Sequence, residues 1–171
     1  MKFLAIIFML FVFMHIVNAL VPYVSRCTKK AEAAKLEIDL DIIATIESSN
    51  NPMAYNIDSE ATGMFQITPI CLRDFNQCNK SELRIHDMYS PANAWHVADW
   101  YLHTRIPQLL KHYKKELTLE NVLIAYNAGI SRVGSEKIPN ETKEYIRKYK
   151  SLMDSKQWFE RQRTKSLKAV Q

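Results

Sequence analysis

Glu47 is the residue whose setting in the chain most strongly suggests acid–base chemistry. It shares one helical face with Leu40 and Ile43, in an apolar run that follows the candidate N-cap Asp39. A carboxyl group at the end of such a face lies against the core and at the negative end of the helix dipole, and both effects raise its pKa. A carboxylic acid still protonated near neutral pH can protonate a leaving glycosidic oxygen. The alternative is a solvated glutamate at a helix end, with no chemical role.

Other chemistry has little support in the residue pattern. The five histidines are scattered, and no Cys/His spacing is typical of a zinc site. With only three glycines, the chain holds neither GxGxxG nor GxxxxGK[ST], so a glycine-rich nucleotide cradle is excluded. We therefore expect no metal and no cofactor.

Cys71 and Cys78 are candidates for a local disulfide. They lie seven residues apart in the polar stretch CLRDFNQC, and such a bond is stable only in an oxidising compartment. Cys27 would then be left over. Pairing of Cys27 with either of the others is the open alternative.

The elements that must position Glu47 are predicted to be helices. Periodicity with start and stop signals predicts helices over 28–36, from Asp39 to the stop at 50–52, over 93–113 with a break at Pro107, from Thr118 to a C-cap at Gly129, and from 139–140 onward. Between 53 and 90 the pattern loosens, which indicates loops or a short β-hairpin. Beyond Met153 the chain is basic and polar.

Length and composition fit one mostly α-helical domain. The chain has 171 residues, of which 47% are hydrophobic and 24% charged, as in ordinary globular proteins. These values exclude a disordered, collagen-like or multi-span membrane protein. Scarce glycine favours helices over a turn-rich β fold.

The first 19 residues have the pattern of a signal peptide. Lys2 precedes an apolar run, and 17–19 (Val-Asn-Ala) form a small-residue cleavage site. The run is short for a membrane-spanning helix, so we expect cleavage after Ala19, with an uncleaved anchor as the alternative. The domains expected are the signal peptide 1–19, a globular domain 20–150 and a basic C-terminal tail 151–171.

Positive charge is concentrated at the C-terminal end. The net charge is +5, yet residues 143–171 hold nine Lys or Arg against three Asp or Glu. The body is therefore near neutral. Such a tail suits an anionic polymer or a membrane surface, or it is a solvated helix end. Its basic residues are interleaved with aromatics only at 158–159, so nucleic-acid binding is not expected.

Three motifs resemble those of the lytic transglycosylase family, whose fold is lysozyme-like. The first is Glu47-Ser48, Asn51-Pro52 and then the Gly63–Pro69 stretch GMFQITP. The second is AYNAG at 125–129, and the third is Glu141-Thr142 followed by Tyr145. Together they cover 38–150. The resemblance implies a mostly α, lysozyme-like (α+β) single domain with at most a short β-hairpin.

The resemblance also implies roles for individual residues. Glu47 becomes the single catalytic acid and base, and Tyr145 orients it. The substrate-binding residues implied are Ser48, Asn56, Met64, Phe65, Gln66, Tyr126, Asn127, Glu141 and Tyr145. The chain departs from the family at Met64-Phe65, where Leu-Met is common, and at Asn56, where Ser is common. Core packing is the alternative for Met64, Phe65 and Tyr145.

The activity implied is cleavage of the β-1,4 bond between N-acetylmuramic acid and N-acetylglucosamine, with a 1,6-anhydro product and no cofactor. A goose-type-like hydrolase using Asp58 or Glu60 as second carboxylate is one alternative, and a non-catalytic peptidoglycan-binding protein is another. We expect an exported protein in the periplasm or cell wall. Its partners would be glycan strands and, by analogy with small exported relatives, a secretion, conjugation or phage machine.

Overall fold

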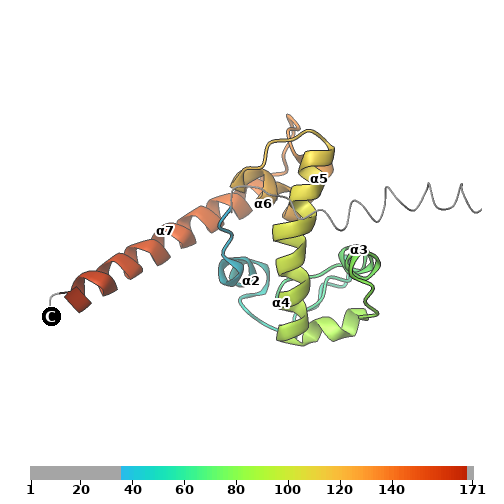
Figure 1. Ribbon diagram of the computed structural model, residues 1–171, viewed down its shortest axis with the longest axis horizontal. Coiled ribbons are helices and arrows are strands. Elements are labelled where there is room, and N and C mark those ends of the chain that lie inside the picture. Colours follow the sequence, from blue (N-terminus) through green and yellow to red (C-terminus); the bar gives the residue numbers. More distant parts are fainter. Residues whose placement is uncertain (1–35, 169–171) are drawn as a thin grey trace, which may run out of the picture.

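Helices make up most of the chain that the structure, a computed structural model, describes, which is residues 36–168 (Figure 1). The elements are α2 (Leu40–Ser48), α3 (Pro69–Asn79), the 3₁₀ helix η1 (Ile85–Tyr89), α4 (Pro91–Trp100), the π-helical turn η2 (Tyr101–Arg105), α5 (Ile106–His112), α6 (Leu119–Ala128), the 3₁₀ helix η3 (Ile130–Arg132) and α7 (Asn140–Lys168). The mostly α-helical fold class is confirmed.

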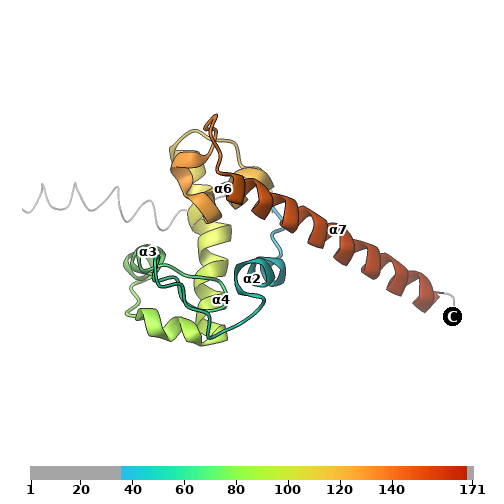
Figure 2. The same ribbon diagram turned by 180° about the vertical axis from the view of Figure 1, so that it is seen from behind.

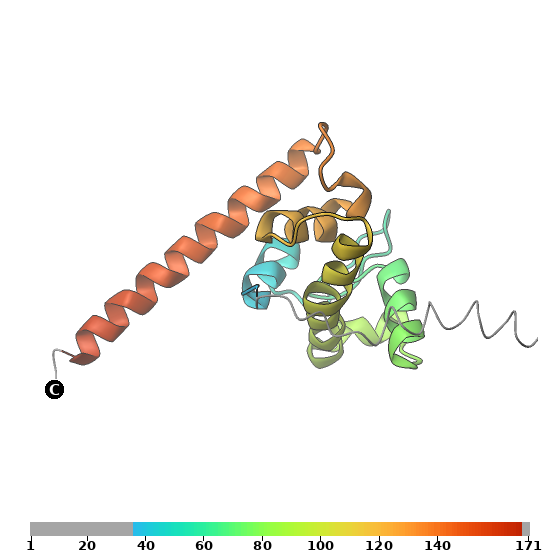
Figure 3. The same cartoon turned by 45° about the horizontal axis from the view of Figure 1, so that its top comes forward.

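A central column organises the arrangement. α4, η2 and α5 run end to end as one rod, and α2 and α3 flank its α4 end (Figures 1 and 2). α6 packs against α5, while α7 packs against α6 and α2. The last turns of α7 project beyond the other described helices (Figure 3). α2 is therefore held between the column and α7.

The core lies where these helices meet. Fully buried apolar side chains come from each of them, among them Ile43, Val97, Leu110, Leu123 and Tyr149. Burying such side chains is the main stabilising term, at about 1.5–3 kcal/mol each. The loops between the helices are fixed around this core.

The helix boundaries follow the sequence signals. Asp39 caps α2 by accepting hydrogen bonds from the N–H groups of Asp41 and Ile42, and Thr118 caps α6 in the same way. Gly129 ends α6 with φ +85°. Pro107 is the second residue of α5, and the chain stays helical from Pro91 to His112, so the break expected at Pro107 is seen only as the change to a π turn just before it.

The stretch 53–90, predicted to form loops or a hairpin, contains the helix α3, so that prediction is wrong for Pro69–Asn79. α3 begins at Thr68, whose hydroxyl accepts a hydrogen bond from Cys71 N–H, with Pro69 at the first helical position. Its buried face is short, consisting of Cys71, Leu72 and Phe75, which explains why periodicity did not reveal it. The described residues of the loop form only isolated bridges, Thr62 with Tyr55 and with Ile67, and no strand.

The expected Cys71–Cys78 disulfide is wrong. Cys71 is a free, buried thiol, whereas Cys78 is disulfide-bonded. Both residues lie on α3, and seven residues of helix separate their Cα atoms by about 10 Å, beyond the ~7 Å limit for a disulfide. Cys27, the signal peptide, its cleavage site and helix 28–36 lie outside the described residues.

α7 continues through the expected boundary between domain and tail at 150–151. Of the helices within 36–168, none is both long enough and apolar enough to cross a membrane.

Candidate active site

A cavity of about 350 Å³ opens beside the end of α2. Its walls come from α2, the loop between α2 and α3, α3, η2, α6 and the start of α7. The lining residues are Glu47, Asn56, Ser59, Ala61, Gln66, Ile67, Thr68, Cys71, Tyr101, Tyr126, Asn127 and Glu141. All three sequence motifs thus meet at one cavity.

Glu47 is a half-buried carboxyl group in the last turn of α2. The pKa of Glu47 is raised to about 7, mainly by burial; the Tyr145 hydroxyl lowers it and the nearby Glu141 carboxylate raises it. At neutral pH a large share of the Glu47 carboxyl groups is therefore protonated. The burial expected from the apolar helix face is confirmed, and Glu141 adds an electrostatic contribution that the pattern did not predict.

Tyr145, in the second turn of α7, is buried beside Glu47. The Tyr145 hydroxyl oxygen has no partner of good hydrogen-bond geometry in the described part of the chain. Its interaction with Glu47 is thus a loose one. The burial that isolates the phenol also raises the pKa of Tyr145 well above its usual value, so the hydroxyl stays a donor.

The loop 63–67 forms a tight wall that depends on its glycine. Gly63 has φ +80°, and a Cβ there would lie 2.1 Å from the carbonyl oxygen of Met88. Gln66 also adopts a left-handed conformation, φ +50°, and its side-chain amide donates to the Gly63 carbonyl oxygen at 3.0 Å. A strained non-glycine residue in a cavity wall is typical of a functional site.

Two hydrogen bonds tie the motifs to this loop. The Ser48 hydroxyl donates to the Met64 carbonyl oxygen at 2.9 Å, and the Tyr126 hydroxyl donates to the Phe65 carbonyl oxygen at 2.8 Å. A third joins α7 to α6, from the Thr142 hydroxyl to Asn127 Oδ1 at 2.7 Å. The end of α2, the loop, α6 and the start of α7 are therefore locked together around Glu47.

The structure divides the residues predicted for the site into two groups. Those lining the cavity are Glu47, Asn56, Gln66, Tyr126, Asn127 and Glu141. The other four, Ser48, Met64, Phe65 and Tyr145, do not line it. Phe65 is fully buried and makes an edge-to-face contact with Trp95, their ring centres 5.6 Å apart. Its side chain packs in the core and is not a wall of the cavity.

Tyr101 and Cys71 also line the cavity, although the sequence pattern placed neither of them there. Both carry apolar bulk on helices, so their pattern resembles core residues, and only the π turn brings Tyr101 to the cavity. Asp58 and Glu60, the second carboxylates of the hydrolase alternative, are exposed and outside the lining. Within 36–168, no three His, Cys, Asp or Glu residues gather closely enough to hold a metal ion.

This fold and site define a class of protein: a mostly α-helical, lysozyme-like domain with an acidic group of raised pKa in its cavity. The chain belongs to the transglycosylase SLT domain family, whose model matches residues 28–149. This membership makes the chain a member of the lytic transglycosylase family. Its substrate is therefore peptidoglycan, and its site of action is extracytoplasmic. The comparisons with curated proteins and with solved structures give no match.

Proposed function

We propose that this protein cleaves the β-1,4 bond between N-acetylmuramic acid and N-acetylglucosamine and forms a 1,6-anhydro product, with Glu47 as acid and then base. The observation that carries the proposal is the raised pKa of Glu47, about 7, in a cavity where three family motifs converge. A group with a pKa near the working pH can both give and take a proton efficiently.

The mechanism needs one carboxyl group. Glu47 protonates the glycosidic oxygen, and the bond from this oxygen to C1 of the muramic acid breaks as positive charge develops at C1. The neighbouring acetamido group helps to stabilise that charge. The Glu47 carboxylate then takes the proton of the C6 hydroxyl, whose oxygen bonds to C1. The proton lost in the first step is regained in the second, and no water is consumed.

The neighbours of Glu47 suit both steps. The Glu141 carboxylate favours the protonated form that the first step requires, whereas the Tyr145 hydroxyl favours the carboxylate that the second step requires. We assign Asn56, Gln66 and Asn127 to hydrogen bonds with the sugars, since their polar side chains line the cavity. Tyr126 supports the wall through its bond to Phe65.

Hydrolysis is less well supported because it requires a second carboxylate to activate water or to act as nucleophile. Asp58 and Glu60 are exposed and outside the cavity lining, which leaves Glu141 as the second acid there. A protein that only binds the wall would have no use for a half-buried acid of raised pKa, because burying that group costs stability.

Mass spectrometry of products from purified peptidoglycan tests the proposal. We expect anhydro-muropeptides from the parent, and a fall of about 10²- to 10⁴-fold for Glu47→Gln. Glu136→Gln, the same change at an exposed position outside the cavity, is the matched control. Products with ordinary reducing ends would indicate hydrolysis and direct attention to Glu141. Retained wall binding without any product would indicate a binding protein.

Export and partner choice belong to the same proposal. We propose that residues 1–19 are a cleaved signal peptide, which N-terminal sequencing of the protein from cells would test.

We also propose that 151–171 dock on a cell-envelope machine. The exposed Trp158 and Phe159, next to each other near the end of α7, support this because exposed aromatic side chains commonly anchor protein interfaces. The docking proposal would be supported if components of a cell-envelope machine co-purified with the parent protein and not with Trp158→Ala.

A further inference from the structure

A second cavity adjoins the one that contains Glu47. It has a volume of about 310 Å³ and lies between α3 and α5, with Ile70, Arg73 and Asp74 on one side and Leu109 on the other. Cys71 and Tyr101 line both cavities. The second cavity, here called the α3–α5 cavity, therefore shares part of its wall with the cavity that contains Glu47.

The charge of the α3–α5 cavity is carried by Arg73. Asp74 is neutralised by Arg105, which makes two hydrogen bonds to its carboxylate, Nε to Oδ2 and Nη2 to Oδ1, the latter at 3.0 Å. This pair is well shielded, since the Arg105 and Asp74 side chains are only 14% and 22% exposed. Arg73 is exposed and forms no ion pair with any described residue. Its cationic group is thus available to a ligand.

The rest of the wall is mixed, with the aliphatic side chains of Ile70 and Leu109 and the polar groups of Gln77 and Tyr101. Ile70 is 70% exposed, which is unusual for an isoleucine, and Leu109 lies across from it on α5. A guanidinium, polar side chains and two aliphatic side chains together suit a short peptide, which offers a carboxylate, backbone amides and small apolar side chains.

We propose that the α3–α5 cavity binds the acidic peptide that peptidoglycan carries on its muramic acid residues, with Arg73 contacting a peptide carboxylate. This inference rests on the proposed function, because it takes the glycan strand to lie beside Glu47. It makes Arg73 a specificity residue that acts on the peptide and takes no part in bond cleavage.

The experiment compares two substrates, purified peptidoglycan with its peptides and the same strands stripped of peptides by an amidase. Release of anhydro-sugars is measured with the full-length parent, Arg73→Gln, Arg73→Lys and Arg132→Gln. Arg132 is an exposed arginine outside both cavities and serves as the matched control. We expect Arg73→Gln to lower kcat/KM about fivefold on the peptide-bearing substrate and to leave it unchanged on stripped strands. Arg73→Lys should lose less, because it keeps the charge.

Other results would overturn the inference. An unchanged rate on peptide-bearing substrate would remove Arg73 from recognition. An equal loss on both substrates would assign Arg73 to the glycan, including the lactyl carboxylate that stripping exposes. Because stripped strands still contain the bond that is cleaved, their turnover by the parent reports on the proposed function separately. Failure of the parent on both substrates would refute the proposed function together with this inference.

Discussion

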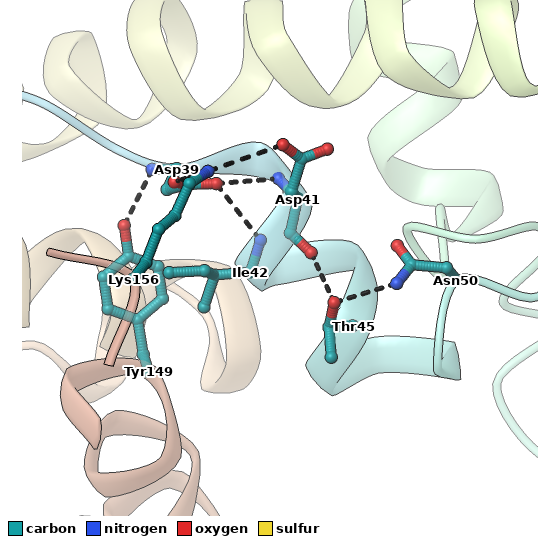
Figure 4. A network of polar contacts seen from close by, with 7 residues as sticks. All are labelled: Asp39, Asp41, Ile42, Thr45, Asn50, Tyr149 and Lys156. Carbon is teal, nitrogen blue, oxygen red and sulfur yellow. Dashed lines mark hydrogen bonds and ion pairs between the residues drawn. The ribbon is translucent and has the colours of Figure 1, made fainter. Parts of the chain in front are cut away.

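Lys156 Nζ lies 2.6 Å from Asp39 Oδ2, in an ion pair that joins the distal part of α7 to the start of α2 (Figure 4). The other Asp39 oxygen caps α2, and the Asp39 N–H donates to the Tyr149 hydroxyl at 2.7 Å. α7 thus contacts the start of α2 at Asp39. It contacts the opposite end of α2 as well, where Tyr145 lies beside Glu47. Lys156 lies beyond residue 149, where the family match ends.

We expect Lys156→Met to lower the free energy of unfolding by about 1 kcal/mol. The Asp39 side chain is only 17% exposed, so this pair is less screened than an ordinary surface pair. Lys150→Met is the control, because Lys150 lies on the same helix as Lys156 and pairs with Glu120 of α6, both side chains being about half exposed. Denaturant unfolding measures both variants. An equal loss in the two would contradict a special role for Lys156.

The pH dependence of cleavage should move in opposite directions in two variants. Glu47 must be protonated to act as the acid, so kcat/KM should fall as pH rises through about 7. Glu141→Gln removes the charge that raises the pKa of Glu47 and should shift this limb to lower pH. Tyr145→Phe removes the hydroxyl that lowers the pKa and should shift it to higher pH. Shifts in the same direction would contradict these assignments.

Glu47→Gln should stabilise the fold in alkaline solution. Because the pKa of Glu47 is raised from 4.5 to about 7 by folding, its contribution to stability is fully present below pH 4.5 and is lost as pH rises through 7. At pH 8 the parent therefore loses roughly 3 kcal/mol that the uncharged glutamine does not lose. Unfolding curves at pH 4.5 and pH 8 would test this. A difference between the two proteins that did not grow with pH would mean that Glu47 is not buried enough to shift.

Gly63→Ala should destabilise the protein more than Gly129→Ala. Both glycines have positive φ, so both variants carry backbone strain of about 1 kcal/mol or more. Only at Gly63 would the new Cβ also collide with backbone, the Met88 carbonyl oxygen at 2.1 Å, whereas Gly129 has nothing within 4 Å. Thermal unfolding of the two variants gives the difference. Equal losses would show that η1 moves aside easily.

Local signals in the chain were enough to predict α2, α6 and the start of α7. Asp39 and Thr118 act on neighbouring N–H groups, and Gly129 ends its helix through its own backbone, so each works within a few residues. The apolar face of α2 likewise predicted that Glu47 would be buried, since helical spacing alone decides which residues share a face. Such features depend on short-range sterics and hydrogen bonds.

Only the tertiary structure decided which side chains line the cavity. Phe65 and Tyr101 are both aromatic residues in apolar settings, yet Phe65 packs inward against Trp95 and Tyr101 lines the cavity. The sequence pattern also did not predict that Arg105 pairs with Asp74, 31 residues away in the chain. Nor did it predict that two turns of α3 separate Cys71 from Cys78. These outcomes depend on how distant segments pack, and periodicity along one segment carries no information about the partner that will cover it.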